Sequence, residues 1–197
     1  MPVEYTNRSG DVYHLQAGIT RNGKPRYWFG RKLTGEPCEA IPAGFEIREN
    51  PANAVVTLRK IRPSEIAPPE LELLSTAIGK EAGLQHFIVD VDGNSMVVYL
   101  PGLDDKAAER SIAELAGPFG AIFRGAELKA SLIARSGYDK VMRFDLVDRD
   151  ERLFIVQRWC FRGSVDDWIW LGGPAPLPDL VRTYSRHLGK ESFFELM

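Results

Sequence analysis

Residues Tyr138 to Phe161 read YDKVMRFDLVDRDERLFIVQRWCF, which is the longest strand-like pattern in the chain. Apolar residues alternate with polar neighbours on both sides of a polar break: Met142, Phe144 and Leu146 before it, and Leu153, Ile155 and Trp159 after it. This period of two is typical of strands with one face on a core. The break, Asp148–Glu151, contains no glycine, which favours a four-residue loop on a type I turn over a two-residue primed turn. The stretch therefore predicts a long antiparallel hairpin.

Composition narrows the class of protein. The chain has 197 residues, of which 44% are hydrophobic, enough for the core of one large domain or two small ones. The net charge of -2 excludes a globally basic nucleic-acid binder. Residues 1 to 62 nevertheless hold 10 Lys and Arg against 6 Asp and Glu, and the remainder holds 15 against 21. An anionic partner is therefore expected at the N-terminal third.

Other features bear on location. Cys38 and Cys160 are the two cysteines, too few for a disulfide framework and without a zinc-type spacing. The N-terminus lacks the pattern of a signal peptide, and no run of 18 apolar residues occurs. We expect a soluble cytoplasmic protein with no membrane partner, no metal and no cofactor.

Two hairpins are predicted in the first 62 residues. Strand-like runs at Asp11–Gly18 and Pro25–Lys32 flank Asn22-Gly23, a pair that tolerates positive φ. Phe45–Arg48 and Val55–Ile61 form a second pair around a polar turn. We expect these four strands to form one small antiparallel unit.

The proline-rich segment Ile61–Glu70 predicts a connector and a domain boundary. Further elements are expected in this order: a helix over Glu70–Ala82 ended by Gly83, a hairpin of Gln85–Val91 and Ser95–Leu100, helices after Asp104 and over Ala126–Ser136, the Tyr138 hairpin, a strand at Trp168–Trp170, an irregular loop GGPAPLP at Gly172–Pro178, and a helix from Pro178. Helices fall between hairpins rather than between single strands, which favours an α+β fold with antiparallel hairpins. The predicted domains are a small all-β module, residues 1–62, and a larger α+β domain, residues 63–197.

A basic aromatic hairpin is the main candidate for partner binding. Its residues are Arg21, Lys24, Arg26, Trp28, Arg31 and Lys32. Cations interleaved with rings can hold phosphates while bases stack on the aromatics. Tyr27 and Phe29 alternate with Trp28, so one side of the strand is expected to face a core. An ordinary solvated basic hairpin is the alternative interpretation.

A second candidate site is His86, Asp90 and Asp92, which share one strand parity and could serve a hydrolase or a metal-dependent enzyme. The calcium-loop pattern fails here, because Ser95 stands at the glycine position and Pro101 at the glutamate position. A hairpin turn with solvated carboxylates is the preferred interpretation of these residues. A nucleophile and base pairing of Cys160 or Ser164 with His187 is left open as well.

Three motifs mark the opening of the chain: NRSGDVY at Asn7–Tyr13, GKPRYWF at Gly23–Phe29, and IPAGFEI at Ile41–Ile47 with Asn50-Pro51 after it. Over about 60 residues this pattern resembles the N-terminal region of a group of uncharacterised bacterial proteins of unknown function. The resemblance implies a bacterial origin and a recurrent small β module. It implies no activity, ligand or functional residue.

These observations lead to two functional hypotheses. The first is a non-catalytic protein that binds a protein or nucleic-acid partner through the basic hairpin, and the alternative is the enzyme with a site near His86. The apolar ending Ser192–Met197 either packs on its own core or docks on a second copy to form a homodimer. Packing on its own core is the expectation.

Overall fold

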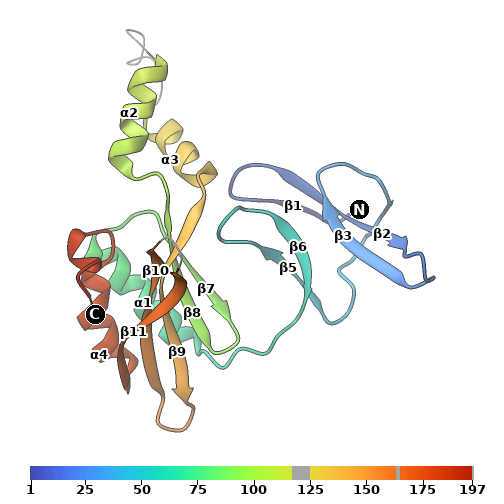
Figure 1. Cartoon of the computed structure of the whole chain (residues 1–197). Coiled ribbons are helices and arrows are strands. Elements are labelled where there is room, and N and C mark those ends of the chain that lie inside the picture. Colours follow the sequence, from blue (N-terminus) through green and yellow to red (C-terminus); the bar gives the residue numbers. More distant parts are fainter. Residues whose placement is uncertain (117–124, 163–164, 197) are drawn as a thin grey trace. The chain divides into compact units, whose positions relative to one another are not determined.

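The computed structural model describes residues 1–116, 125–162 and 165–196. The fold is α+β, and every described strand pair is antiparallel. The chain forms two compact units, Met1–Ile61 with Gly102–Gly137, and Arg62–Pro101 with Tyr138–Met197 (Figure 1). None of the helices in these described ranges is long and apolar enough to cross a bilayer.

Residues 1–61 form two sheets. The first contains β1 (Glu4–Thr6), β2 (Val12–Ile19), β3 (Pro25–Gly30) and β4 (Glu36–Pro37), and the second contains β5 (Phe45–Glu49) and β6 (Val56–Lys60). Both predicted hairpins are present, and they belong to two separate sheets of one compact unit. One edge of β2 pairs with β3 and the other with β1 and β4, so β2 has no free edge for the second hairpin. The two short strands β1 and β4 gave no periodic signal in the sequence.

A small hydrophobic cluster joins these sheets. Its buried members are Tyr13, Leu15, Phe29 and Val56, with Ile47 and Leu58 of the second hairpin packed against them. The alternation in β3 places Phe29 in this core and Trp28 on the opposite face, as its period predicts. The basic hairpin therefore has one buried face and one outer face.

Helices α2 (Asp105–Ala116) and α3 (Gly125–Arg135) form a pair. The Asp104 carboxylate caps α2 by accepting a hydrogen bond from the Ala107 amide at 2.6 Å. Lys129 of α3 forms ion pairs with Asp105 at 2.9 Å and with Glu109 at 3.1 Å, which link the two helices. The predicted stop of α2 at Gly117-Pro118 lies outside the described residues.

The second unit is built on a five-stranded antiparallel sheet in the order β11-β10-β9-β8-β7. Its strands are β7 (Ile88–Asp92), β8 (Ser95–Pro101), β9 (Tyr138–Asp148), β10 (Leu153–Arg162) and β11 (Val165–Pro176). The predicted hairpin from Tyr138 is confirmed as β9 and β10, and four residues connect the strands. Arg152 closes this loop at a φ of 51°.

The sequence prediction of an irregular loop at Gly172–Pro178 is wrong, because β11 continues to Pro176. β11 is an edge strand, so its prolines need no partner on the outer side. A Cβ at Gly173 would clash with the Phe154 carbonyl, and one at Gly172 would clash with the Tyr184 hydroxyl. The glycines are needed here for close packing inside a strand. The sequence prediction treats the same glycines and prolines as turn formers and therefore expects a loop.

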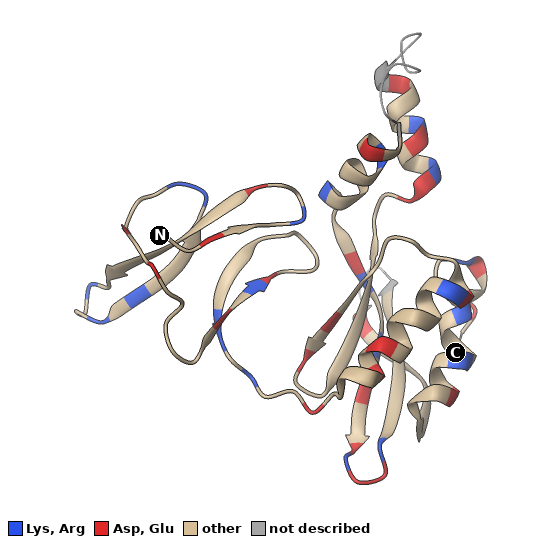
Figure 2. Ribbon diagram, turned by 180° about the vertical axis from the view of Figure 1, so that it is seen from behind, with Lys and Arg blue, Asp and Glu red and all other residues tan. Residues whose placement is uncertain are grey.

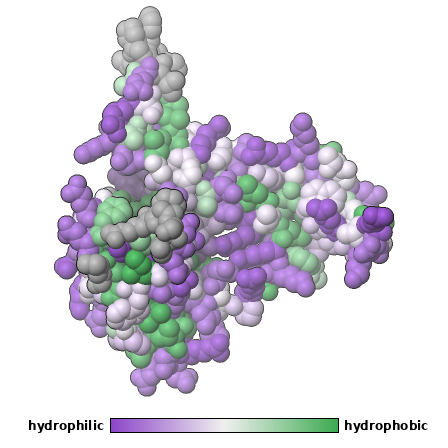
Figure 3. Space-filling model, viewed as in Figure 1, coloured by the Kyte–Doolittle hydropathy of each residue, from purple (hydrophilic) through white to green (hydrophobic). Residues whose placement is uncertain are grey.

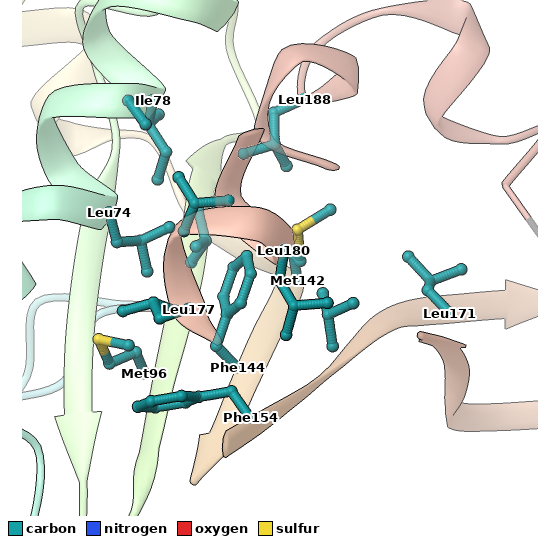
Figure 4. Packing of buried hydrophobic residues seen from close by; sticks show 14 of the residues in the cluster. Leu74, Ile78, Met96, Met142, Phe144, Phe154, Leu171, Leu177, Leu180 and Leu188 are labelled. Atoms are coloured by element: carbon teal, nitrogen blue, oxygen red, sulfur yellow. The ribbon is translucent and has the colours of Figure 1, made fainter. Parts of the chain in front are cut away.

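Two helices pack on the same face of this sheet. They are α1 (Pro68–Ala77), continued by a π-helical turn at Ile78–Ala82, and α4 (Leu177–Tyr184), continued by a 3₁₀ turn at Ser185–His187. Leu74 and Ile78 of the first and Leu180 of the second meet Phe144 and Phe154 of the sheet in the main hydrophobic core (Figure 4). Gly83 ends the first helix at a φ of 70°, as its position predicts. We call the opposite side of the sheet the outer face.

The C-terminal segment packs on its own unit. Phe193, in the 3₁₀ turn Glu191–Phe193, is buried in the main core, and Leu196 packs against it. Arg158, a buried residue of β10, donates a hydrogen bond from Nε to the Leu196 carbonyl at 2.9 Å. The expectation of own-core packing is confirmed for the described part of this segment, while Phe194 stays 71% exposed.

Candidate functional site

The turn of the β2–β3 hairpin presents two cations to solvent. The Thr20 hydroxyl accepts a hydrogen bond from the Lys24 amide at 3.1 Å, and Gly23 adopts a φ of 74°. This tight local closure leaves Arg21 and Lys24 exposed on either side of the turn. Figure 2 shows Lys and Arg in blue at this turn and along β3.

The loop after β3 is folded by one buried side chain. Gln16 is fully buried, and its Oε1 accepts hydrogen bonds from the amides of Thr34 at 2.6 Å and Gly35 at 2.8 Å. Its Nε2 donates to the Lys32 carbonyl at 2.8 Å. Since both ends of the amide are satisfied, the loop is fixed against the outer side of β2. Lys32 therefore projects from an ordered segment.

Trp28 lies between this loop and the sheet. A Cβ at Gly18 would come within 3.0 Å of its indole, and one at Gly35 within 2.6 Å, so both glycines are required for this packing. The Arg26 guanidinium lies 5.5 Å from the ring centroid, which is within cation–π range. Trp28 is half-buried, and Arg26 and Trp28 form one composite surface.

The cations of this hairpin differ in their partners. Arg31 forms an ion pair with Asp11 at 2.8 Å, and its Nε donates to the Tyr13 hydroxyl at 3.3 Å. The Tyr13 contact, followed by the Asp11 charge, raises the pKa of Arg31, so this guanidinium stays charged. Among the cations of this hairpin and the loop after it, Arg21, Lys24, Arg26 and Lys32 are exposed and have no carboxylate within 4.0 Å among the described side chains. These four side chains can donate charge-assisted hydrogen bonds to phosphate oxygens.

The second candidate site is more dispersed than its sequence pattern indicates. β7 begins at Ile88, so His86 precedes the strand and does not share its alternation. Asp92 lies 3.6 Å from Arg62 in an exposed ion pair, and Asp90 pairs in register with Val97. Within residues 1–116, 125–162 and 165–196, no group of three His, Cys, Asp or Glu side chains could hold a metal ion.

His187 has a structural contact. Arg186 Nε donates to His187 Nε2 at 3.3 Å, and His187 Nδ1 lies 2.9 Å from Ser192 Oγ. A guanidinium can only donate, so Nε2 accepts, and the neutral ring carries its proton on Nδ1. The ring therefore donates to Ser192 and fastens the C-terminal segment. Cys160 is buried, and Ser164 lies outside the described residues.

A wide, open depression lies on α2, and it is lined by Asp104, Lys106, Glu109, Arg110 and Ala113. None of the sequence-predicted site residues lines it. In Figure 3, hydrophilic residues in purple cover much of the face in view, and hydrophobic residues in green form separate groups.

Sequence reasoning missed a set of side chains on the outer face of the five-stranded sheet. Trp159 of β10 pairs in register with Trp168 of β11, and Trp170 follows on the same side of β11. The sequence does indicate that Trp168 and Trp170 share one face, because they are two positions apart in a strand. Their meeting with Trp159 depends on the strand register, which the sequence does not state.

Compared with family models, with curated proteins and with solved structures, the chain has no significant match.

Proposed function

We propose that the protein is a non-catalytic binding protein whose β2–β3 hairpin binds an anionic partner, and that this partner is a single-stranded nucleic acid. The observation that carries the proposal is the set of four exposed cations, Arg21, Lys24, Arg26 and Lys32, which have no carboxylate partner among the described side chains. Charges left without an internal partner are available to phosphates.

The aromatic residues favour a single strand over an acidic protein. Arg26 lies over Trp28, and Tyr27 on the other side of β3 is 38% exposed. Base stacking on such rings contributes about 1–3 kcal/mol per base and requires unpaired bases. Residues 1–61 also hold 9 Lys and Arg against 6 Asp and Glu, the sign that a phosphate backbone requires.

The same proposal places the protein in a bacterial cytoplasm. Cys38 and Cys160 are both free thiols, as expected in a reducing compartment. The resemblance of the first 60 or so residues to bacterial proteins supports the origin. Fractionation of the native host with an antibody to this chain would test the location.

The test of binding is fluorescence anisotropy of labelled thymidine and uridine oligomers against the full chain at several salt concentrations. Four phosphate contacts predict a slope of log affinity against log salt of about −3, since each contact on a single strand contributes about 0.7. The double variant Arg21→Ala with Lys24→Ala should lower the affinity and reduce this slope to about half.

The matched control removes the same charge elsewhere. Lys80 and Lys190 are exposed residues of the other unit, so Lys80→Ala with Lys190→Ala should leave binding unchanged. If both double variants lose the same affinity, the loss comes from the change in net charge and not from these two side chains, which would contradict the proposed site. If the chain binds an acidic protein and shows no affinity for either oligomer, a nucleic acid is rejected as the partner.

A further inference from the structure

The outer face of the five-stranded sheet carries an unusual concentration of tryptophan. Three of the four tryptophans of the chain, Trp159, Trp168 and Trp170, lie on this face. Their strand neighbours Cys160 and Leu171 point to the opposite side and are buried. Trp170 is 57% exposed, and the other two rings are half-buried.

These rings and two cations form one connected cluster. Trp159 and Trp168 meet edge to face with centroids 5.2 Å apart. Lys140 Nζ lies 3.4 Å from the Trp159 centroid, and the Arg143 guanidinium lies 4.6 Å from the Trp168 centroid. Cation–π pairs occur about once per 70–80 residues, so about two or three are expected in the whole chain. This cluster alone contains two of them.

A row of hydrogen bonds fixes the polar residues beside the rings. Arg143 Nε donates to Gln157 Oε1 at 2.7 Å and pairs with Asp145 Oδ2 at 2.9 Å. The Ser95 hydroxyl donates to Asp145 at 2.5 Å, so the row spans β8, β9 and β10. Side chains already held in place lose little conformational entropy when a partner binds.

We propose that this outer face is the contact surface between two copies of the chain, related by a twofold axis. Its composition is that of a protein interface, in which tryptophan and arginine are enriched and dominate the binding energy. The unit that carries it is acidic, with 11 Lys and Arg against 16 Asp and Glu over residues 62–101 and 138–197. This balance disfavours a nucleic acid on this face.

Charge complementarity identifies a second copy as the occupant. Lys140 and Asp166 both lie at the tryptophan cluster, and neither has an oppositely charged group within 4.0 Å among the side chains that the structure describes. An interface with twofold symmetry must be complementary to itself, so a residue of one copy meets a different residue of the other. Lys140 of each copy can therefore face Asp166 of its partner. This inference is independent of the nucleic-acid proposal.

The test is the mass of the full chain by sedimentation equilibrium over a wide concentration range at physiological salt. We expect a concentration-dependent dimer. Trp170→Ala should weaken it by about thirtyfold, the equivalent of an interface hot spot. Because Trp170 is largely exposed, circular dichroism of this variant should match that of the wild type.

Charge reversal provides a second, independent variant. Lys140→Glu and Asp166→Lys should each weaken the dimer by about tenfold, and the double variant should regain most of the loss. Phe194→Ala is the matched control, since this aromatic residue is 71% exposed on the C-terminal segment and should leave the dimer intact.

Three outcomes would overturn the proposal. A monomer at all concentrations would mean that no second copy binds this face. A dimer that survives both Trp170→Ala and Lys140→Glu would use another surface, and loss through Phe194→Ala would identify that surface as the C-terminal segment. An assembly larger than a dimer would contradict the closed twofold contact.

Discussion

The hydrophobic cluster on the five-stranded sheet contains 16 buried residues, whereas the cluster between the two N-terminal sheets contains four. A few buried side chains cannot offset the conformational entropy of ordering many loop residues. The N-terminal sheets therefore require another source of stability. The structure identifies this source in buried polar side chains at their turns.

Asn7 and the Arg8–Glu49 pair show how these turns are held. Asn7 is buried, and it donates to the Ala54 carbonyl at 2.9 Å while its side-chain oxygen accepts from the Asp11 amide at 2.8 Å. Arg8 pairs with Glu49 at 2.8 Å and so joins the turn after β1 to the end of β5. Polar residues hold the N-terminal sheets together, and apolar burial holds the five-stranded sheet and its helices.

The largest effect is expected from the main core. Phe144→Ala removes a fully buried ring of β9 and should lower the free energy of unfolding by about 3–5 kcal/mol, measured by urea denaturation. Val147→Ala, an exposed change on the same strand, should cost less than about 0.5 kcal/mol. Hydrogen exchange should show the loosening in residues 138–197. Equal loosening of residues 1–61 would mean that the two regions unfold as one, and the comparison would fail.

An intermediate effect is expected from a polar residue of the N-terminal sheets. Gln16→Ala leaves the amides of Thr34 and Gly35 without their acceptor and should cost about 1–3 kcal/mol. Faster hydrogen exchange of these two amides would report the loss directly. Gln85→Ala, a change of the same kind at an exposed glutamine, is the control. Equal stability of the two variants would show that polar contacts do not hold this loop.

The smallest effect concerns alkaline pH. Burial, and then the Glu49 carboxylate 3.2 Å from its hydroxyl, raise the pKa of Tyr5 above its usual value. The folded state thus holds this proton more tightly than the unfolded chain. The contribution is complete below about pH 10 and is lost as the pH rises through the folded pKa.

Tyr5→Phe should therefore reduce the loss of stability between about pH 9 and about pH 11, measured as the shift of the urea midpoint. Glu49→Gln should act in the same direction, because it removes the charge that opposes ionisation of Tyr5. If stability declines equally at alkaline pH in both variants and in the wild type, Tyr5 does not belong to the polar network that holds the N-terminal sheets.

Much of the fold could be predicted from local patterns. The alternation of Met142, Phe144 and Leu146, the Asn22-Gly23 turn and the glycine at position 83 all act through neighbouring residues, and the structure confirms each element. The division of the first 62 residues into two sheets could not be predicted in this way. It follows from pairing at both edges of β2, which involves residues far apart in the chain.

The same distinction between local patterns and contacts distant in sequence applies to the two candidate surfaces. The sequence by itself determined the backbone periods, the turns and the basic composition of the β2–β3 hairpin, because these depend on residues within a few positions of each other. Only the tertiary structure decided that Asp11 and Tyr13 engage Arg31, while the neighbouring cations have no carboxylate within 4.0 Å among the described side chains. It also decided that three tryptophans meet on one sheet face, because strand register, which pairs Trp159 with Trp168, is a property of the assembled sheet.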